Sequence, residues 1–246
     1  MTPAERLEIA EHLCRLIVRA RGEAVLGVSI YGSTARGADG PRSDLEMKVL
    51  LADGDAHDVE YVHVSGLKVE LNYQPFDDYV DSVLRVTPDW PLCAAEHRGR
   101  RVLFERDGAF AAAEAAAGTP DDGDFAAAQV EVVAQELFEE MGKLRSAHDR
   151  GDADAVRAAA HHLAWTAAMW LALENRTPFR TGGTVWAEAA AFAILPDGWA
   201  TDHRVLAGLD WASADDVRAA AERVWGGIEA IAEARGIAWQ SEDWRV

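Results

Sequence analysis

The sequence is poor in cysteine and in long apolar runs. It has 2 cysteines, Cys14 and Cys93, in 246 residues, which argues against a disulfide framework or a cysteine-ligated metal site, and we expect two buried, reduced thiols. The first eleven residues lack the basic-then-apolar pattern of a secretion signal. The most apolar helical stretch, residues 163–173, is too short to cross a bilayer. These absences predict a cytoplasmic protein.

Positive charge is also scarce. The chain has 24 Lys and Arg against 42 Asp and Glu, a formal net charge of −18. DNA, RNA and anionic lipid would be repelled by such a surface, so we expect neither a nucleic acid nor a membrane as partner. A cationic partner is favoured instead. This inference is specific only if acidic residues also line a binding cleft, because many proteins are acidic for solubility alone.

Two carboxylates open one of the expected strands. Residues 44–51 read as a strand, and Asp44 and Glu46, two positions apart, would share one of its faces. Neighbouring carboxylates repel each other unless a cation lies between them. Mg²⁺ is such a cation, and it usually takes one or two protein carboxylates together with substrate phosphates. Glu70, on a further expected strand, could reach the same metal from a neighbouring position.

A phosphate-binding turn precedes these carboxylates. An expected strand, residues 24–31, runs into Gly32-Ser33, whose backbone N–H and hydroxyl can contact a phosphate at close range. Arg36, in the polar loop that follows, adds a bidentate phosphate donor. A Gly-Ser turn followed by Asp-x-Glu is the signature of polymerase-β-like nucleotidyltransferases. The alternative is a plain strand connection with a solvated acidic end.

The pattern of elements predicts an α+β protein. An N-terminal domain, residues 1–122, would combine a mixed sheet with flanking helices, and a C-terminal domain, residues 123–246, would be an all-α bundle. The expected helices and strands in the first domain are helix 3–21, strands 24–31, 44–51, 60–64 and 67–72, helix 76–86, and strand 101–104. Pro91 interrupts the chain after the second of these helices. Helices are expected in the second domain at 124–148, 152–174, 184–193 and 213–235.

The helix expected at 124–148 has an acidic face. Glu136, Glu139, Glu140 and Lys143 lie opposite its apolar stripe, at spacings of three and four residues. The simpler interpretation is a solvated face with ion pairing between Glu139 and Lys143. The alternative makes Glu139 a general base and places Lys143 on a phosphate.

A resemblance decides between these alternatives. The residues that carry it are Tyr31-Gly32-Ser33, Asp39-Gly40-Pro41, Ser43-Asp44-Leu45-Glu46-Met47, Lys68-Val69-Glu70 with Asn72, Asp89-Trp90-Pro91-Leu92, Glu136-Leu137-Phe138-Glu139, Gly142-Lys143 and Trp225 with Gly227-Ile228. With these residues, the chain resembles the kanamycin nucleotidyltransferases (aminoglycoside 4'-O-nucleotidyltransferases) over nearly its whole length.

The resemblance implies a reaction and an assembly. A nucleoside monophosphate would pass from ATP or another NTP to the 4'-hydroxyl of an aminoglycoside, with Mg²⁺ required and pyrophosphate released, so that the drug is inactivated. The protein would be a homodimer with each active site at the subunit interface. Glu139 and Lys143 would be presented by the partner subunit.

The resemblance also implies roles for single residues. The catalytic residues would be Glu139 as the base and Asp44 and Glu46 as magnesium ligands, with Glu70 close to the metal. Nucleotide contacts would come from Gly32, Ser33, Arg36, Lys143 and Thr181. Acceptor contacts would come from Lys68, Glu70, Asp89, Glu96 and Glu136.

Three departures concern the acceptor. Pro88 stands where the family offers a hydroxyl, Glu96 stands where it has an amide, and residues 58–64 match poorly. The reaction type is unaffected, but the acceptor is left open. The alternatives are a nucleotidyltransferase acting on another hydroxylated small molecule or a protein side chain, and a non-catalytic binder of a cationic drug or a nucleotide.

Overall fold

The computed structural model describes residues 1–52, 54 and 57–240, and they form two compact units. Unit 1 comprises Met1–Arg85 and Cys93–Pro120, and unit 2 comprises Val86–Leu92 and Asp121–Val246. The last six residues of the expected C-terminal domain, 241–246, lie outside the described part of the chain. Within the described part, no helix is both long and apolar enough to cross a membrane.

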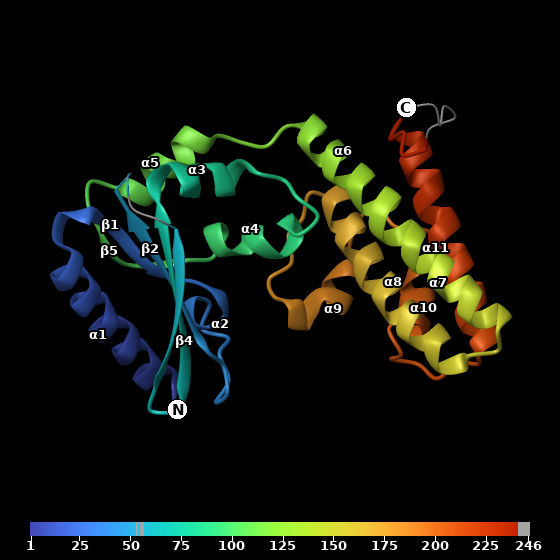
Figure 1. Cartoon of the computed structure of the whole chain (residues 1–246), viewed down its shortest axis with the longest axis horizontal. Coiled ribbons are helices and arrows are strands. Elements are labelled where there is room, and N and C mark those ends of the chain that lie inside the picture. Colours follow the sequence, from blue (N-terminus) through green and yellow to red (C-terminus); the bar gives the residue numbers. More distant parts are fainter. Residues whose placement is uncertain (53, 55–56, 241–246) are drawn as a thin grey trace. The chain divides into compact units, whose positions relative to one another are not determined.

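Unit 1 is a sheet with helices on both faces (Figure 1). Its elements are α1 (Pro3–Arg21), the 3₁₀ turn Gly22–Ala24, β1 (Val25–Ile30), α2 (Gly32–Ala35), β2 (Leu45–Leu51), β3 (Asp58–Val64), β4 (Leu67–Pro75), α3 (Phe76–Leu84), α4 (Trp90–Arg98), β5 (Arg101–Glu105) and α5 (Ala109–Ala117). Only the first residues of α4 belong to unit 2.

The strands are ordered β3-β4-β2-β1-β5. β2 runs parallel to β4 and antiparallel to β1, so the sheet is mixed as expected. β3 and β4 pair antiparallel and form a hairpin. The register places Glu46 opposite Glu70 and Lys48 opposite Asn72. Residues opposite each other share a face, so the sheet register collects polar side chains on one side.

The opposite face of the sheet is apolar and is covered by α1. Thr2 and Glu5 form a capping box that begins this helix. Ala10, Cys14 and Ile17 of α1 pack in one buried cluster with alternate residues of the three central strands. This alternation produces one apolar face and one polar face from the same strands.

The polar face is covered by helices only in part. Leu50, near the end of β2, is buried with Tyr79 of α3 and with Phe110 of α5. A Cβ atom at Gly27 would lie 2.6 Å from the Phe110 ring, so α5 requires a glycine on β1. The remaining positions of this face belong to the polar residues described below.

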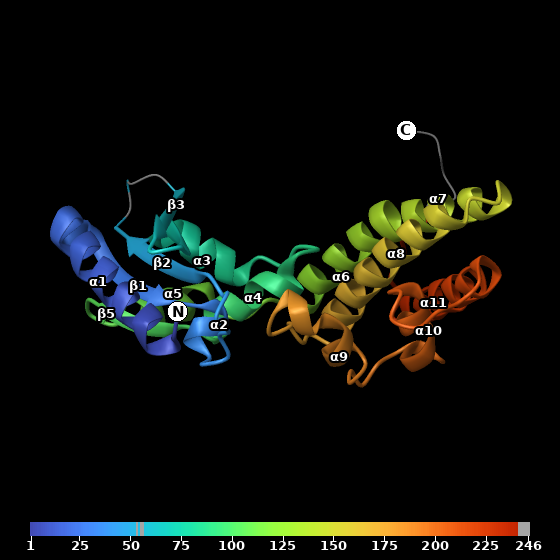
Figure 2. The same cartoon turned by 90° about the horizontal axis from the view of Figure 1, so that it is seen from below.

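Unit 2 is helical, as expected. Its elements are α6 (Asp122–Glu131), a π-helical segment (Val132–Leu137), α7 (Phe138–Asp149), α8 (Ala153–Glu174), the 3₁₀ turn Gly182–Thr184, α9 (Val185–Ala189), α10 (Trp199–Leu206) and α11 (Ala214–Ala234). Helices α7 and α8 run side by side in both views (Figures 1 and 2). The buried face of α8 is rich in alanine, which permits close approach of its neighbours.

The structure differs from the expectations at five points. Pro91 was expected to interrupt the chain, but it lies in the first turn of α4. Its missing N–H costs nothing there, because the N–H groups of a first turn have no partner within the helix. Gly32 and Ser33 are the first residues of a one-turn helix, α2, rather than a turn into an open loop. The helix expected at 124–148 contains the π-helical segment, and α10 was not expected. Cys93 is exposed, whereas Cys14 is buried as predicted.

Candidate active site

The acidic site of unit 1 is built on two adjacent parallel strands. Glu46 of β2 and Glu70 of β4 are directly opposite each other, and Asp44 immediately precedes β2. All three side chains are partly exposed. The expectation that Glu70 comes from a strand next to that of Glu46 is therefore confirmed. Asp44 lies two positions before Glu46, just before the start of β2.

Gly32 is required where the first strand turns into α2. Its φ is +66°, and a Cβ atom there would overlap the Glu46 carboxylate. Only glycine combines this backbone conformation with the absence of a side chain. The chain therefore brings the start of α2, where Ser33 lies, close to the Glu46 carboxylate.

Burial is the main perturbation at Glu46. Burial and then the carboxylates of Asp44, Glu70 and Glu96 raise its pKa to about 7, while Arg36 acts in the opposite direction. Neighbouring negative charges disfavour ionisation of a partly buried acid. A cation beside Glu46 would remove this repulsion.

The other site carboxylates have partners within unit 1. The Lys68 Nζ lies 3.6 Å from an oxygen of Asp44. The Tyr31 hydroxyl donates to Glu70 at 2.9 Å. Burial and the neighbouring carboxylates raise the pKa of the Tyr31 phenol, so its hydroxyl is a proton donor at neutral pH.

A divalent cation fits these carboxylates if the phosphates of a nucleotide supply its remaining ligands. Among the described residues, no three or more His, Cys, Asp or Glu side chains are grouped to hold a metal ion by themselves. Mg²⁺ keeps several waters and substrate phosphates as ligands and needs only one or two protein carboxylates. The carboxylates of Asp44, Glu70 and Glu96 all lie near enough to act on Glu46, so negative charge gathers here. Asp44, Glu46 and Glu70 are therefore suited to a cation that arrives with a triphosphate.

Sequence reasoning missed Lys48. This residue lies two positions after Glu46 on β2 and is 6% exposed. Its Nζ donates to Gln74 Oε1 at 3.0 Å and lies 3.6 Å from Glu96 Oε2. Burial lowers the pKa of the Lys48 ammonium, while the Glu96 carboxylate acts to raise it. The available signal was a lysine inside a strand whose other residues, apart from Glu46, are apolar.

The second set of candidate residues lies in unit 2. Glu139 and Lys143 are exposed on α7, one helical turn apart. The Lys143 Nζ lies 2.9 Å from Glu139 and 2.8 Å from Glu140. The two side-chain hydrogen bonds raise the pKa of the Lys143 ammonium. The ion pair of the simpler interpretation is therefore present, and both side chains remain open to a ligand.

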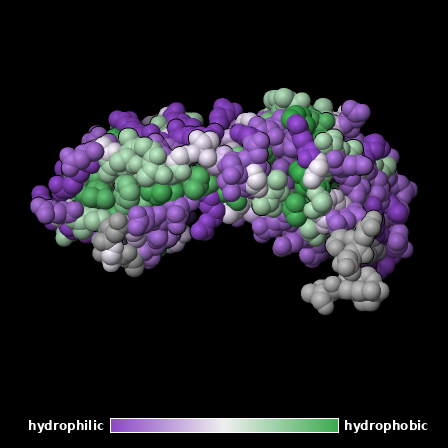
Figure 3. All heavy atoms as spheres, turned by 90° about the horizontal axis from the view of Figure 1, so that it is seen from above, coloured by the Kyte–Doolittle hydropathy of each residue, from purple (hydrophilic) through white to green (hydrophobic). Residues whose placement is uncertain are grey.

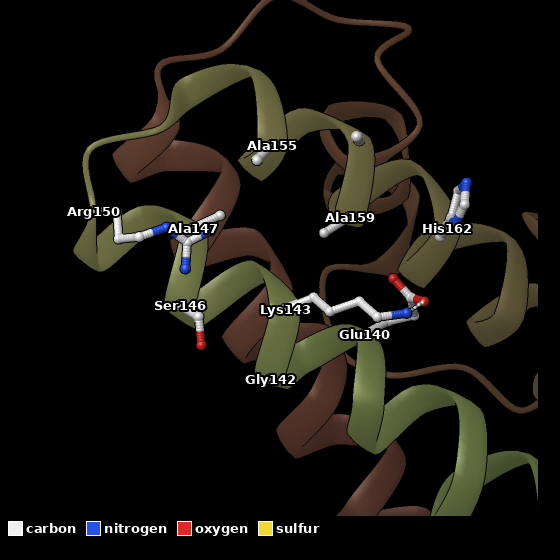
Figure 4. Close-up of a pocket in the computed structure, with 10 residues that line it drawn as sticks. Glu140, Gly142, Lys143, Ser146, Ala147, Arg150, Ala155, Ala159 and His162 are labelled. Atoms are coloured by element: carbon white, nitrogen blue, oxygen red, sulfur yellow. Dashed lines mark hydrogen bonds and ion pairs between the residues drawn. The ribbon is translucent and has the colours of Figure 1, made fainter.

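Lys143 also borders an open cavity of about 620 Å³ between α7 and α8. In Figure 4 its side chain reaches along the cavity to Glu140, with Ala155 and Ala159 of α8 on the facing wall. Arg150 and His162 lie at the two ends. The cavity thus has a small-residue wall and cationic groups at its edge.

Three further predicted residues belong to unit 2. Burial and the neighbouring Asp89 carboxylate raise the pKa of Glu136, so these two acids lie close enough for their charges to interact. Thr181 begins a 3₁₀ turn, and its hydroxyl accepts from the backbone N–H of Gly183.

The structure thus groups the predicted residues into two sets. Unit 1 holds Gly32, Ser33, Arg36, Asp44, Glu46, Lys68, Glu70 and Glu96, and unit 2 holds Asp89, Glu136, Glu139, Lys143 and Thr181.

The chain is similar to a known family and to two named proteins. Residues 107–238 match the family model described as the KNTase C-terminal domain. Two proteins called aminoglycoside nucleotidyltransferase (4'), from Staphylococcus aureus and a Bacillus species, are each 27% identical over 239 residues, which is 96% of this chain and 93% of theirs.

The fold has a relative among solved structures. A nucleotidyltransferase-like protein from Exiguobacterium sibiricum superposes with a TM-score of 0.52 and 15% identity, covering 93% of this chain and 76% of that one. At this identity the likeness concerns the fold alone.

Proposed function

The chain belongs to the KNTase family, and from this premise we propose that it transfers a nucleoside monophosphate from ATP or another NTP to the 4'-hydroxyl of an aminoglycoside. The observation that carries the proposal is the pairing of Glu46 with Glu70 across parallel strands beside Asp44. Full-length similarity to the two 4' enzymes supports the choice of acceptor. The net charge of −18 suits an acceptor that carries several ammonium groups.

We assign nucleotide binding to the turn and the carboxylates of unit 1. Gly32 and Ser33 offer a backbone N–H and a hydroxyl to the phosphates, and Arg36 offers its guanidinium. Asp44 and Glu46 would hold Mg²⁺, with Glu70 nearby. The bound metal would neutralise phosphate charge and make the α-phosphorus easier to attack.

Glu139 is assigned as the general base. It takes the proton of the acceptor hydroxyl, whose oxygen forms a bond to the α-phosphorus. The bond from that phosphorus to the bridging oxygen of the β-phosphate breaks, and pyrophosphate leaves. Lys143 and Thr181 are assigned to the phosphates, where Lys143 offsets charge on the leaving group.

We further propose a homodimer in which Glu139 and Lys143 serve the acidic site of the partner subunit. Their exposure on α7 supports this, because a shared site needs groups that face away from their own core. In this arrangement residues 1–122 act as the nucleotidyltransferase domain and residues 123–246 as the helical domain that supplies the base.

The test of the reaction is pyrophosphate release with ATP, Mg²⁺ and kanamycin, measured against a reaction without drug. We expect drug-dependent release and a mass gain of one nucleotidyl group on the drug. Asp44→Asn and Glu46→Gln should each lower turnover by about 100-fold or more. Full activity in both variants would contradict the metal assignment, and no release with any aminoglycoside would contradict the acceptor.

A mixing experiment tests the shared site. Asp44→Asn and Glu139→Gln are each expected to be inactive alone, because each removes one half of the site. Hybrid dimers would contain one site with both substitutions and one intact site, so mixing the two variants should restore about a quarter of the wild-type activity. If both residues serve the same chain's site, mixing restores nothing.

A further inference from the structure

Lys48 is a buried lysine for which the proposed reaction has no assigned step. Lysine is almost never fully buried unless it is paired, because moving an ammonium out of water is costly. Lys48, Lys68 and Lys143 are the three lysines of the whole sequence. Unlike the other two, Lys48 is buried, on the polar face of the sheet and in the middle of β2.

The contacts of Lys48 lead toward the acceptor-binding residues. Its Nζ lies 3.0 Å from Gln74 Oε1 and 3.6 Å from Glu96 Oε2. It also lies 5.7 Å from the centre of the Tyr31 ring, and the Tyr31 hydroxyl donates to Glu70. The ammonium thus lies beside Glu96 and beside Tyr31, which contacts Glu70, and both of these glutamates are acceptor candidates.

Glu96 faces Lys48 from α4 and remains reachable from outside. Its side chain is 33% exposed, whereas that of Lys48 is 8% exposed. One oxygen of the carboxylate is therefore directed at the buried ammonium, and the group is still open to solvent on another side. A carboxylate has room for about four hydrogen bonds, so one internal partner does not saturate it.

We propose that Lys48 is a positioning residue for acceptor recognition, which fixes the Glu96 carboxylate so that its outer side can bind an ammonium group of the acceptor. The inference rests on the proposed function, since it deepens the acceptor site of that reaction. A fixed carboxylate binds a cation better than a mobile one because less side-chain freedom is lost on binding. Lys48 itself touches neither the reacting atoms nor the acceptor.

A double-mutant cycle tests the proposal. Lys48→Met keeps an unbranched side chain, shorter by the ammonium nitrogen, and removes its charge, and Glu96→Gln keeps the shape and removes the other charge. We expect each variant to raise the KM for kanamycin about tenfold, with kcat and the KM for ATP within about twofold of wild type. Lys48→Met/Glu96→Gln should be no worse than either single variant, because both changes remove the same interaction.

The matched control is a part-buried ion pair of unit 2. Arg223 of α11 pairs with Asp202 of α10, and neither helix carries a proposed acceptor residue. Arg223→Met should lower the midpoint of unfolding and leave the KM for kanamycin unchanged. If Arg223→Met raises that KM as Lys48→Met does, or if the effects of Lys48→Met and Glu96→Gln multiply, the proposal is overturned.

A spectroscopic readout keeps the test independent of how well Lys48→Met folds. With ¹⁵N-labelled lysine, the ammonium spectrum of the chain contains signals from three lysines only. Kanamycin, added without nucleotide, should move the Lys48 signal in wild type and not in Glu96→Gln. If the wild-type enzyme modifies kanamycin but its Lys48 signal does not shift when kanamycin is added, this inference alone is overturned. Wild-type protein that modifies no aminoglycoside overturns the proposed function instead.

Discussion

At the residue scale, the acidic site depends on a glycine as much as on its carboxylates. Gly32 has a φ of +66°, and the space that its Cβ would take is filled by the Glu46 carboxylate. A side chain here would push the end of a flexible glutamate rather than the backbone. The cost of a substitution should therefore fall mainly on the site and less on the stability of the fold.

Gly32→Ala is expected to reduce nucleotidyl transfer by about 100-fold, because the displaced Glu46 carboxylate no longer holds its position. Gly37→Ala is the matched control, since Gly37 has the same φ of +66° and nothing within 4 Å of its Cβ. Both variants should lose about 1–2 kcal/mol of stability from the strained backbone. Steady-state kinetics and urea denaturation separate the two effects, and equal loss of activity in both variants would refute the steric argument.

A second prediction at this scale concerns His97, on α4. Burial and then the positive charges of Lys48 and Arg100 lower its pKa from 6.5 to about 4. Between these values the unfolded chain binds a proton that the folded chain does not, so stability decreases as the pH falls through this window. His97→Gln should weaken this pH dependence.

The measurement for His97 is the free energy of unfolding by urea at about pH 7 and about pH 5. His12→Gln, at an exposed position of α1, controls for removal of a histidine. A His97→Gln variant with the full acid-side loss of the wild type would show that other groups are responsible.

At the element scale, α1 is connected to the loop that leads to Asp44. Arg6 of α1 is fully buried, pairs with Asp39 and donates to the Gly40 carbonyl at 3.0 Å. The Asp39 side chain is 2% exposed. This contact holds a polar loop against α1, and the loop lies between the Gly32-Ser33 turn and the carboxylates of Asp44 and Glu46.

Arg6→Met is expected to cost about 3–5 kcal/mol of stability, because it leaves the Asp39 carboxylate buried without its partner. It should also raise the KM for ATP, since the loop next to the nucleotide contacts is released. Arg6→Met/Asp39→Asn should recover part of the stability, because no buried charge is left. Urea denaturation decides the point, and a double variant less stable than Arg6→Met would contradict the argument.

At the scale of the whole molecule, the charge of −18 should affect the binding of both proposed substrates. Hydrophilic residues cover much of both units on the face drawn in Figure 3. An acidic protein attracts a cationic acceptor and repels a nucleotide, and dissolved salt screens both effects over a distance of about 10 Å at 0.1 M.

Raising the salt concentration from about 0.05 to about 0.3 M should therefore raise the KM for kanamycin several-fold and leave the KM for ATP equal or lower. A higher KM for kanamycin together with an equal or lower KM for ATP is the result that indicates electrostatic attraction of the acceptor. Equal movement of both constants would point to a general effect of salt on the enzyme and would contradict electrostatic attraction of the acceptor.

The sequence predicted most of the helices and strands. The strands that carry Glu46 and Glu70 alternate clearly, and their parallel pairing brings the two acids side by side. Pro91 was ambiguous, because proline both disturbs the residue before it and favours the first turn of a helix. Lys48 could not be assigned a partner, because Glu96 is 48 positions further along the chain.

By itself, the sequence determined the α+β class, the Gly-Ser and Asp-x-Glu arrangement and the helix that carries Glu139, because these depend on local periodicity and spacing. Only the tertiary structure decided which carboxylates have internal partners. It paired Lys68 with Asp44, Tyr31 with Glu70 and Lys48 with Glu96, and it buried Glu46 among the acids. Those contacts join distant segments through sheet register and helix packing, which no local pattern records.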